Sequence, residues 1–299
     1  MVWGSQQESS KSLHTYSVQN LTIEQHEIFS EAFALKVQVK VFLPPNYQAD
    51  KLAQYATLYI NDGQDAVAVN VADTLQQLYT SRKIKPIIVV AISMLPDRMA
   101  TYGFSDRESQ KSLPAETRYG SVGKSAHEYS EWLALKLVPY IDRHYRTLAK
   151  PQERAILGWS LGAANAFNIG WNYPDVFSKI GSFSASFWLS EKSNDPSTQL
   201  VHKLIVNKPL PESFSVWLAV GTEEETDDRD SDGIIDTMDD SQDLLVALEN
   251  KKLANPGSTI NHDFSFTPFP GGQHNQQTWK RMLPDFLIWA YPLENPSRK

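Results

Sequence analysis

The chain has 299 residues, a net charge of −7 and no cysteine. The negative charge leaves no basic stripe that could meet phosphates, which argues against a nucleic-acid partner. The lack of cysteine excludes disulfides, thiolate metal sites and a cysteine nucleophile. No apolar run approaches the length of a membrane span, and the polar residues 1–11 lack the apolar core of a signal peptide. We therefore expect a globular protein with a sizeable core.

The N-terminal part predicts a flexible tail followed by antiparallel strands. Residues 1–15 are rich in Ser and Gln and predict the tail. Residues 22–29 and 34–43 predict two strands, and the second alternates strictly between apolar and polar side chains, as a half-buried strand does. No linker or repeat divides residues 16–299, which therefore predict a single domain.

From residue 56 onward, short apolar runs alternate with segments of helical spacing. The expected strands are residues 56–63, 86–92, 154–157, 179–184, 216–220 and 264–268. The expected helices are residues 67–79, residues 126–145, a helix that begins near 163, one around 244–248, and residues 276–290. This alternation predicts an α/β fold with a mostly parallel central sheet, an antiparallel N-terminal edge and helices on both faces.

One five-residue pattern lies between an expected strand and an expected helix: Gly158-Trp159-Ser160-Leu161-Gly162. A Gly-x-Ser-x-Gly in this position is the nucleophile elbow of α/β-hydrolases, in which a tight turn lifts the serine Oγ out of the sheet. The bare pattern also occurs by chance, and the alternative interpretation is an ordinary serine in a turn between glycines. The rest of the chain must therefore supply the partners of Ser160.

In α/β-hydrolases an acid and then a histidine follow the serine along the chain, at the carboxyl ends of later strands. Three histidines lie beyond Ser160. His202 is in a helical segment, and His262 precedes a strand and so lies at the wrong edge of the sheet. His274 follows the last strand in a glycine-rich loop, which predicts it as the general base.

The acid should follow the strand at 216–220, where the loop is crowded with carboxylates. Any of five could orient the imidazole: Glu223, Glu224, Glu225, Asp227 and Asp228. An oxyanion hole needs two backbone N–H groups, one from the residue after the nucleophile and one from the loop after an earlier strand. These are expected from Leu161 and Gln64, and loss of such a donor typically costs about 3 kcal/mol of transition-state stabilisation.

The chain resembles the putative-esterase branch of the α/β-hydrolases from about residue 37 to residue 289. That branch includes enterochelin-type esterases, feruloyl esterases, S-formylglutathione hydrolase and mycolyltransferases. The segments that carry the resemblance are residues 58–64, 137–147, 158–162, 173–178, 184–188 and 272–274, with Trp279. The resemblance implies Glu224 as the acid, with Glu223 and Asp228 as alternatives. Two departures are Gln273, which separates the paired glycines from His274, and the unusual length of the acidic loop.

That acidic loop, an insertion at about 223–240, contains a calcium-binding pattern. Residues 228–239 follow the EF-hand template, with Asp instead of Glu at the twelfth position. The expected ligands are Asp228, Asp230, Asp232, the carbonyl of Ile234, Asp236 and Asp239. The alternative is a solvated acidic loop. We expect a structural Ca²⁺ and no organic cofactor, and such loops favour a periplasmic or extracellular setting.

The sequence also suggests residues of a substrate pocket. Arg98 and Tyr102 lie in a long connection at the carboxyl side of the sheet. Trp159 directly precedes Ser160, and Trp188 follows the next expected strand, residues 179–184. For both tryptophans the alternative is core packing. The expected activity is a serine carboxylic-ester hydrolase that acts on a small-molecule or polysaccharide-linked ester. Transfer of the acyl group to another alcohol and an inactive calcium-dependent binding module are the alternatives, and the oligomeric state stays open.

Overall fold

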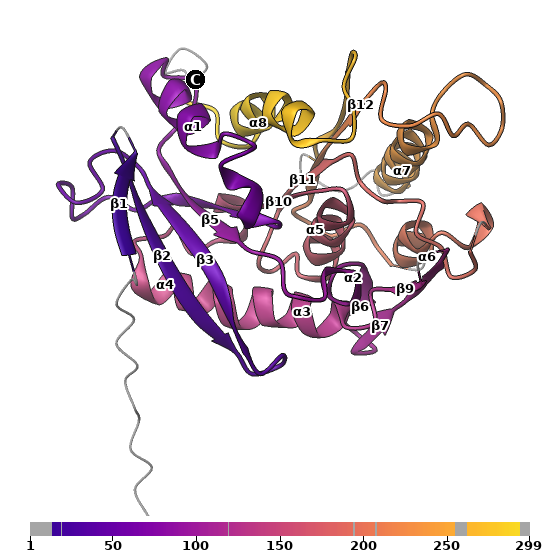
Figure 1. Ribbon diagram of the computed structural model, residues 1–299, viewed down its shortest axis with the longest axis horizontal. Helices are drawn as coiled ribbons and strands as arrows, with labels where there is room; N and C mark the ends of the chain where they lie inside the picture. The colour runs from indigo at the N-terminus through magenta and orange to yellow at the C-terminus, as the bar shows by residue number, and fades with distance from the viewer. Residues whose placement is uncertain are drawn as a thin grey trace, which may run out of the picture.

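The computed structural model describes residues 14–18, 20–118, 120–193, 195–206, 208–254 and 262–293. The long strands are β1 (His14–Val18), β2 (Leu21–Ser30), β3 (Leu35–Leu43), β4 (Ala56–Ile60), β5 (Ile87–Ile92), β10 (Arg154–Trp159), β11 (Lys179–Phe183), β12 (Ser215–Gly221) and β13 (Phe264–Phe269). They form one 9-stranded sheet in the order β1-β2-β3-β5-β4-β10-β11-β12-β13. The sheet runs through the middle of the molecule (Figure 1).

The strand directions confirm the expected mixed sheet. β1, β2 and β3 pair antiparallel, and β3 also runs antiparallel to β5. From β5 across to β13 every neighbouring pair is parallel. One boundary was wrong, because His14 and Thr15, expected in the tail, pair with Gln25 and Glu24 of β2. The remainder of the expected tail, residues 1–13, lies outside the described residues.

Helices cover both faces of the sheet. They are α1 (Val71–Thr80), α3 (Ala126–Trp132), α4 (Val138–His144), α5 (Leu161–Asn172), α6 (Leu200–Val206), α7 (Asp236–Leu253) and α8 (Gln276–Ala290). Figure 1 shows α1 and α8 together on one side, and α3 and α4 on the other. Side chains of β5 alternate between two apolar clusters: Val90 belongs to the cluster that includes residues of α3 to α7, and Val89 belongs to the cluster that includes residues of α1 and α8. This explains why the strand is apolar without interruption.

The helix expected at residues 126–145 is not regular throughout. A π-helical segment, η2 (Leu133–Leu137), separates α3 from α4. Pro139 follows directly in the first turn of α4, and proline has no N–H to donate to the residue four positions earlier. Such a single π-helical turn is one of the ways in which an α-helix accommodates an interruption of its hydrogen-bond ladder. No helix in the described part of the chain combines the length and apolar character that a membrane span requires.

The connection after β5 contains small elements that the sequence did not predict. They are α2 (Arg98–Thr101), a hairpin of β6 (Phe104–Asp106) with β7 (Lys111–Leu113), and a hairpin of β8 (Ala115–Thr117) with β9 (Gly120–Val122). The 3-10 turns are η1 (Gly63–Ala66), η3 (Pro151–Glu153) and η4 (Pro196–Thr198). Three-residue strands are too short to show a period, so these hairpins carry no sequence signal.

Candidate active site

The carboxyl ends of the parallel strands meet at one edge of the sheet, and polar residues follow several of them. Asp62 comes just after β4, Ser160 after β10 and Ser184 after β11. Glu224 follows β12, and His274 follows β13. The parallel order therefore brings together residues that lie up to about 210 positions apart in the chain, as open α/β sheets do at their binding crevices.

The Ser160 turn, residues 158–162, has a strained backbone. Ser160 adopts φ 57° and ψ −128°, which L-residues rarely adopt, and it immediately precedes the first residue of α5. Both glycines are required by close approach. A Cβ on Gly158 would lie 2.2 Å from the carbonyl oxygen of Gly162, and a Cβ on Gly162 would lie 2.4 Å from Oδ2 of Asp62. The sequence pattern thus has a steric cause at each glycine.

Ser160, His274 and Glu224 lie in one line of hydrogen-bond distances. The Nε2 atom of His274 is 3.0 Å from Oγ of Ser160, and its Nδ1 atom is 2.9 Å from Oε2 of Glu224. The Glu224 side chain is almost fully buried, whereas 39% of the His274 side chain is exposed. A buried carboxylate beside a partly exposed imidazole is the arrangement that can stabilise a proton on that ring.

Two residues that the sequence did not single out as site residues hold Glu224 in place. Its Oε1 atom accepts hydrogen bonds from the Ser184 hydroxyl at 2.5 Å and from the Gly221 N–H at 2.6 Å. The Ser184 oxygen in turn accepts a bond from Trp279 Nε1 at 2.9 Å. The Trp279 ring also packs edge-on against His274. Ser184 was part of a family segment, but no pattern in the sequence revealed this contact across the sheet.

The other acids that the sequence left open take different positions. Glu223 is exposed, and its backbone N–H donates to the carbonyl of Gly272. Asp228 accepts hydrogen bonds from the N–H groups of Asp232 and Gly233 within the acidic loop. Among the carboxylates of the described residues, the one hydrogen-bonded to His274 is that of Glu224.

The two expected oxyanion donors lie at the same edge of the sheet. Leu161 is the first residue of α5, and Gln64 lies in η1, directly after β4. Within the described part of the chain, neither backbone N–H donates to a protein acceptor. At Gly63, η1 passes close to the end of β5. A Cβ at this position would lie 2.4 Å from the carbonyl carbon of Ala91, so the close approach requires glycine.

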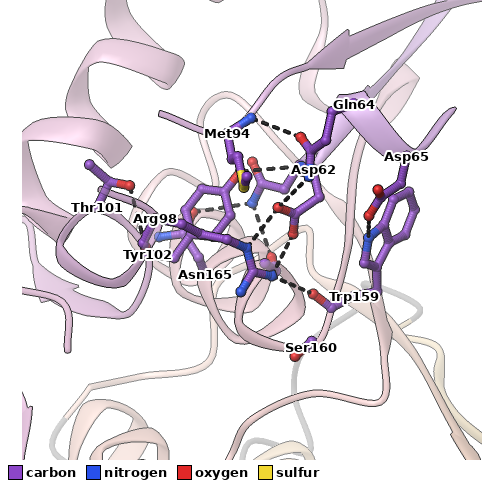
Figure 2. A network of polar contacts seen from close by, with 12 residues as sticks. Asp62, Gln64, Asp65, Met94, Arg98, Thr101, Tyr102, Trp159, Ser160 and Asn165 are labelled. Carbon is purple, nitrogen blue, oxygen red and sulfur yellow. Dashed lines mark hydrogen bonds and ion pairs between the residues drawn. The ribbon is translucent and has the colours of Figure 1, made fainter. Parts of the chain in front are cut away.

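Arg98 and Tyr102 contact the loop after β4. The Nε and Nη2 atoms of Arg98 lie 2.8 and 2.7 Å from the two carboxylate oxygens of Asp62 (Figure 2). Burial alone would lower the pKa of Arg98, but the hydrogen bonds and charge of Asp62 outweigh it and raise the pKa. Tyr102 was expected in the substrate pocket, which is wrong: it is fully buried, and its hydroxyl accepts the N–H of Asp62.

The two tryptophans expected to line the pocket differ. Trp159 is only 1% exposed, so for this residue the core-packing interpretation is right. It stacks on Trp279 and donates its indole N–H to Asp65 at 3.1 Å. Trp188 is 42% exposed and lines a cavity of about 400 Å³. The cavity is bounded by β8, the segment before α6 and the acidic loop, and Arg118 and Glu225 are among its walls.

The acidic loop brings several of the expected calcium ligands together. Carboxylate oxygens of Asp228, Asp230 and Asp232 lie within 4.8 Å of one another. Burial and the charges of Asp232 and Asp230 raise the pKa of Asp239 to about 6. Asp236 differs from the template because it accepts the N–H of Arg229 and also lies 3.7 Å from that guanidinium. Ile234 is half-buried.

The mixed sheet, with helices on both faces and a serine on a strained strand-to-helix turn, defines an α/β-hydrolase fold. Residues 30–290 match the family described as Putative esterase. The chain therefore belongs to this family, and it is a carboxylic ester hydrolase.

Solved structures share the fold of this chain, and several proteins are similar to it in sequence. A ferulic acid esterase superimposes with a TM-score of 0.62 over 91% of this chain and 98% of its own, at 20% identity. The enterobactin esterase FES from Shigella flexneri has a TM-score of 0.67 and 16% identity, and the match covers 90% of this chain and 58% of that one. The uncharacterized protein YjcH of Bacillus subtilis (strain 168) is 24% identical over 88% of this chain and 95% of its own. An endo-1,4-beta-xylanase/feruloyl esterase of Xylanibacter ruminicola is 27% identical over 58% of this chain, but the match covers 23% of that protein.

Proposed function

We propose that this esterase works through a Ser160–His274–Glu224 triad and an acyl-enzyme intermediate. The observation that supports it is the unbroken line of hydrogen-bond distances from Ser160 Oγ through the imidazole to a buried carboxylate. Each distance lies in the range that proton transfer to a general base requires. The burial of Glu224 and the two further donors to its Oε1 atom keep its other oxygen directed at the imidazole.

The proposed reaction has two steps. In the first, His274 Nε2 takes the proton of the Ser160 hydroxyl as Oγ attacks the ester carbonyl carbon, and the protonated ring then gives that proton to the departing alcohol. In the second, His274 takes a proton from water as the water oxygen attacks the acyl carbonyl carbon, and the protonated ring then returns that proton to Ser160 Oγ as the bond between Oγ and the acyl carbon breaks, which releases the carboxylic acid and free Ser160. Glu224 accepts the Nδ1–H of His274 throughout and stabilises the protonated ring.

The negative charge on the carbonyl oxygen would be held by the N–H groups of Leu161 and Gln64. Both lack protein acceptors among the described residues, and the N-terminal end of α5 carries a partial positive charge. The pair therefore offers preorganised donors for a tetrahedral intermediate, and such donors act mainly on the transition state.

The proposed substrate is a small-molecule or polysaccharide-linked ester, and the feruloyl esterase relatives suggest an aromatic acyl group. We expect methyl ferulate and p-nitrophenyl acetate to be cleaved, with the free acid as product. An added alcohol such as glycerol, assayed by chromatography of the products, separates hydrolysis from acyl transfer. Transfer to the alcohol in preference to water would contradict the hydrolase assignment.

We also propose a structural Ca²⁺ in the acidic loop. Three of the expected side-chain ligands gather there, those of Asp228, Asp230 and Asp232, and oxygen-only donor sets are what Ca²⁺ prefers. Asp236 would have to leave Arg229 or bind through water, as the ninth position of such loops often does. The ion would neutralise the crowded carboxylates and fix the segment between Glu224 and α7.

Calcium should therefore raise the thermal stability of the protein, and a chelator should lower it. At a calcium concentration 100 times Kd, binding adds about 2.7 kcal/mol to the free energy of unfolding. Thermal unfolding with Ca²⁺, with Mg²⁺ and with EDTA measures the effect. Asp230→Asn should abolish the calcium-dependent shift, whereas Asp50→Asn, which changes an exposed carboxylate outside the loop, should retain it. An unfolding temperature that does not respond to chelation would refute the calcium site.

A further inference from the structure

We infer that the Asp62–Arg98 ion pair is the positioning element that sets the distance between the two oxyanion donors, the N–H groups of Gln64 and Leu161. This inference rests on the proposed serine mechanism and deepens it. The pair lies beside Ser160, and in Figure 2 the Arg98 guanidinium is seen between Asp62 and the carbonyl of Trp159. Within the described part of the chain, neither residue is hydrogen-bonded to a triad side chain, so each would act through the backbone that it holds.

The backbone of Asp62 needs such support. Asp62 adopts φ 58° and ψ 41°, a left-handed conformation that side chains with a Cβ disfavour. It comes two residues before Gln64, so its conformation decides where the Gln64 N–H is directed. Its own N–H donates to the Tyr102 hydroxyl at 3.2 Å, and its carbonyl accepts the N–H of Asp65 at 3.0 Å.

The carboxylate of Asp62 links the two halves of the expected oxyanion hole. Its Oδ1 atom accepts the side-chain amide of Gln64 at 3.2 Å. Its Oδ2 atom lies against Gly162 in the first turn of α5, where a Cβ would be only 2.4 Å away. One buried carboxylate thus contacts both the residue that offers one donor and the helical turn that offers the other. The Gln64 side chain is also fixed from the end of β5, because its Oε1 atom accepts the N–H of Met94.

Arg98 completes the link and neutralises the buried charge. Its two bonds to Asp62 are parallel, which fixes the orientation of the carboxylate as well as its position. The Nη2 atom also lies 3.5 Å from the carbonyl oxygen of Trp159, the residue before Ser160. Arg98 therefore ties the loop after β4 to the Ser160 turn. If Arg98 were removed, the buried negative charge of Asp62 would lose this partner, which is unfavourable because a buried charge has no water to solvate it.

A different role for Arg98 would be to bind an anionic group of the substrate, since 27% of its side chain is exposed. The two roles make different kinetic predictions. A substrate-binding cation affects KM, and only for anionic esters. A residue that positions the oxyanion donors affects kcat for neutral esters, because those donors act on the transition state.

The test compares Arg98→Gln, Arg98→Lys, Asp62→Asn and the double variant Asp62→Asn/Arg98→Gln. For neutral p-nitrophenyl acetate, we expect kcat to fall by about 10- to 100-fold with little change in KM, less than the loss of a whole donor. The inhibition constant of phenylboronic acid, which forms a tetrahedral adduct with a catalytic serine, should rise by a similar factor. The double variant should be no worse than the more severe single variant, because the two residues act as one unit. Arg98→Lys should fall between the wild type and Arg98→Gln, and it serves as the test if the other variants fail to fold.

Arg107→Gln is the matched control. Arg107 lies in the same connection after β5, but it pairs with Asp175 and donates to the carbonyl of Asn172 at the C-terminal end of α5, and both side chains of the pair are substantially exposed. This variant should keep wild-type kcat and KM. Unchanged kcat for the neutral ester in Arg98→Lys and Arg98→Gln would overturn the inference, as would an effect confined to the KM of anionic esters. The proposed serine mechanism has a separate readout, because it fails if Ser160→Ala retains turnover.

Discussion

Ser160→Ala should lower kcat for p-nitrophenyl acetate by about 10⁵- to 10⁶-fold and leave the fold intact. The Ser160 oxygen forms the covalent bond to the acyl group. Among the described residues, no other side-chain hydroxyl lies within hydrogen-bond distance of His274 Nε2 to replace it. The fold should tolerate the change. Among the described side chains, the Ser160 hydroxyl is hydrogen-bonded to His274, and this ring is partly exposed, so water can replace the lost partner. Circular dichroism and thermal unfolding check the fold.

Ser178→Ala is the matched control for that substitution. Ser178 directly precedes β11, at the opposite edge of the sheet, and its hydroxyl donates to the carbonyl of Pro151. Its loss should leave kcat unchanged within about twofold. Turnover by Ser160→Ala near the wild-type rate would contradict the proposed nucleophile, whatever the fate of the fold.

Glu224→Gln should lower kcat by about 10³- to 10⁴-fold, comparable with the effect of replacing a triad aspartate by asparagine. An amide at this position no longer offers a charge to stabilise the protonated imidazole, and its NH₂ group could favour the wrong tautomer of His274. In the wild type, the Gly221 N–H and the Ser184 hydroxyl both donate to the Glu224 carboxylate. If the NH₂ group of the glutamine faced these two donors instead of His274, it would lose both hydrogen bonds. Steady-state kinetics on a folded variant measures the loss.

Glu223→Gln separates this prediction from a general effect of charge in the acidic loop. Glu223 is the adjacent residue and is exposed, so the substitution removes the same charge without touching His274. We expect its kcat to stay within about twofold of the wild type. The opposite pattern, a loss in Glu223→Gln and full activity in Glu224→Gln, would mean that Glu224 is not the acid.

Much of the fold followed from the sequence because its strands are strongly patterned. The uninterrupted apolar run at residues 86–92 predicted a strand, and the side chains of that strand, β5, alternate between the two cores. The small hairpins after β5 were missed because strands such as β6 and β8 are three residues long. Residues 14 and 15 were expected in a polar tail, yet they pair as an edge strand whose side chains are exposed.

The site was predicted less evenly. Chain order and strand ends were enough to select Ser160 and His274, since only His274 follows the carboxyl end of a late strand. The residues alone left five carboxylates open as the acid, and the resemblance favoured Glu224, which the structure distinguishes from Glu223 by its burial and by the hydroxyl of Ser184. Burial also explains the failures at Tyr102 and Trp159: both lie near the site, but their rings face the core.

The central claim is that Ser160 is the nucleophile that carries the acyl group. Labelling with a fluorophosphonate, followed by mass spectrometry of the intact protein and its peptides, tests this most directly. We predict one adduct per chain on the peptide that contains Ser160, with loss of ester turnover in proportion to labelling and no adduct in Ser160→Ala. Full labelling at another residue, or full turnover by a protein labelled at Ser160, would contradict the account.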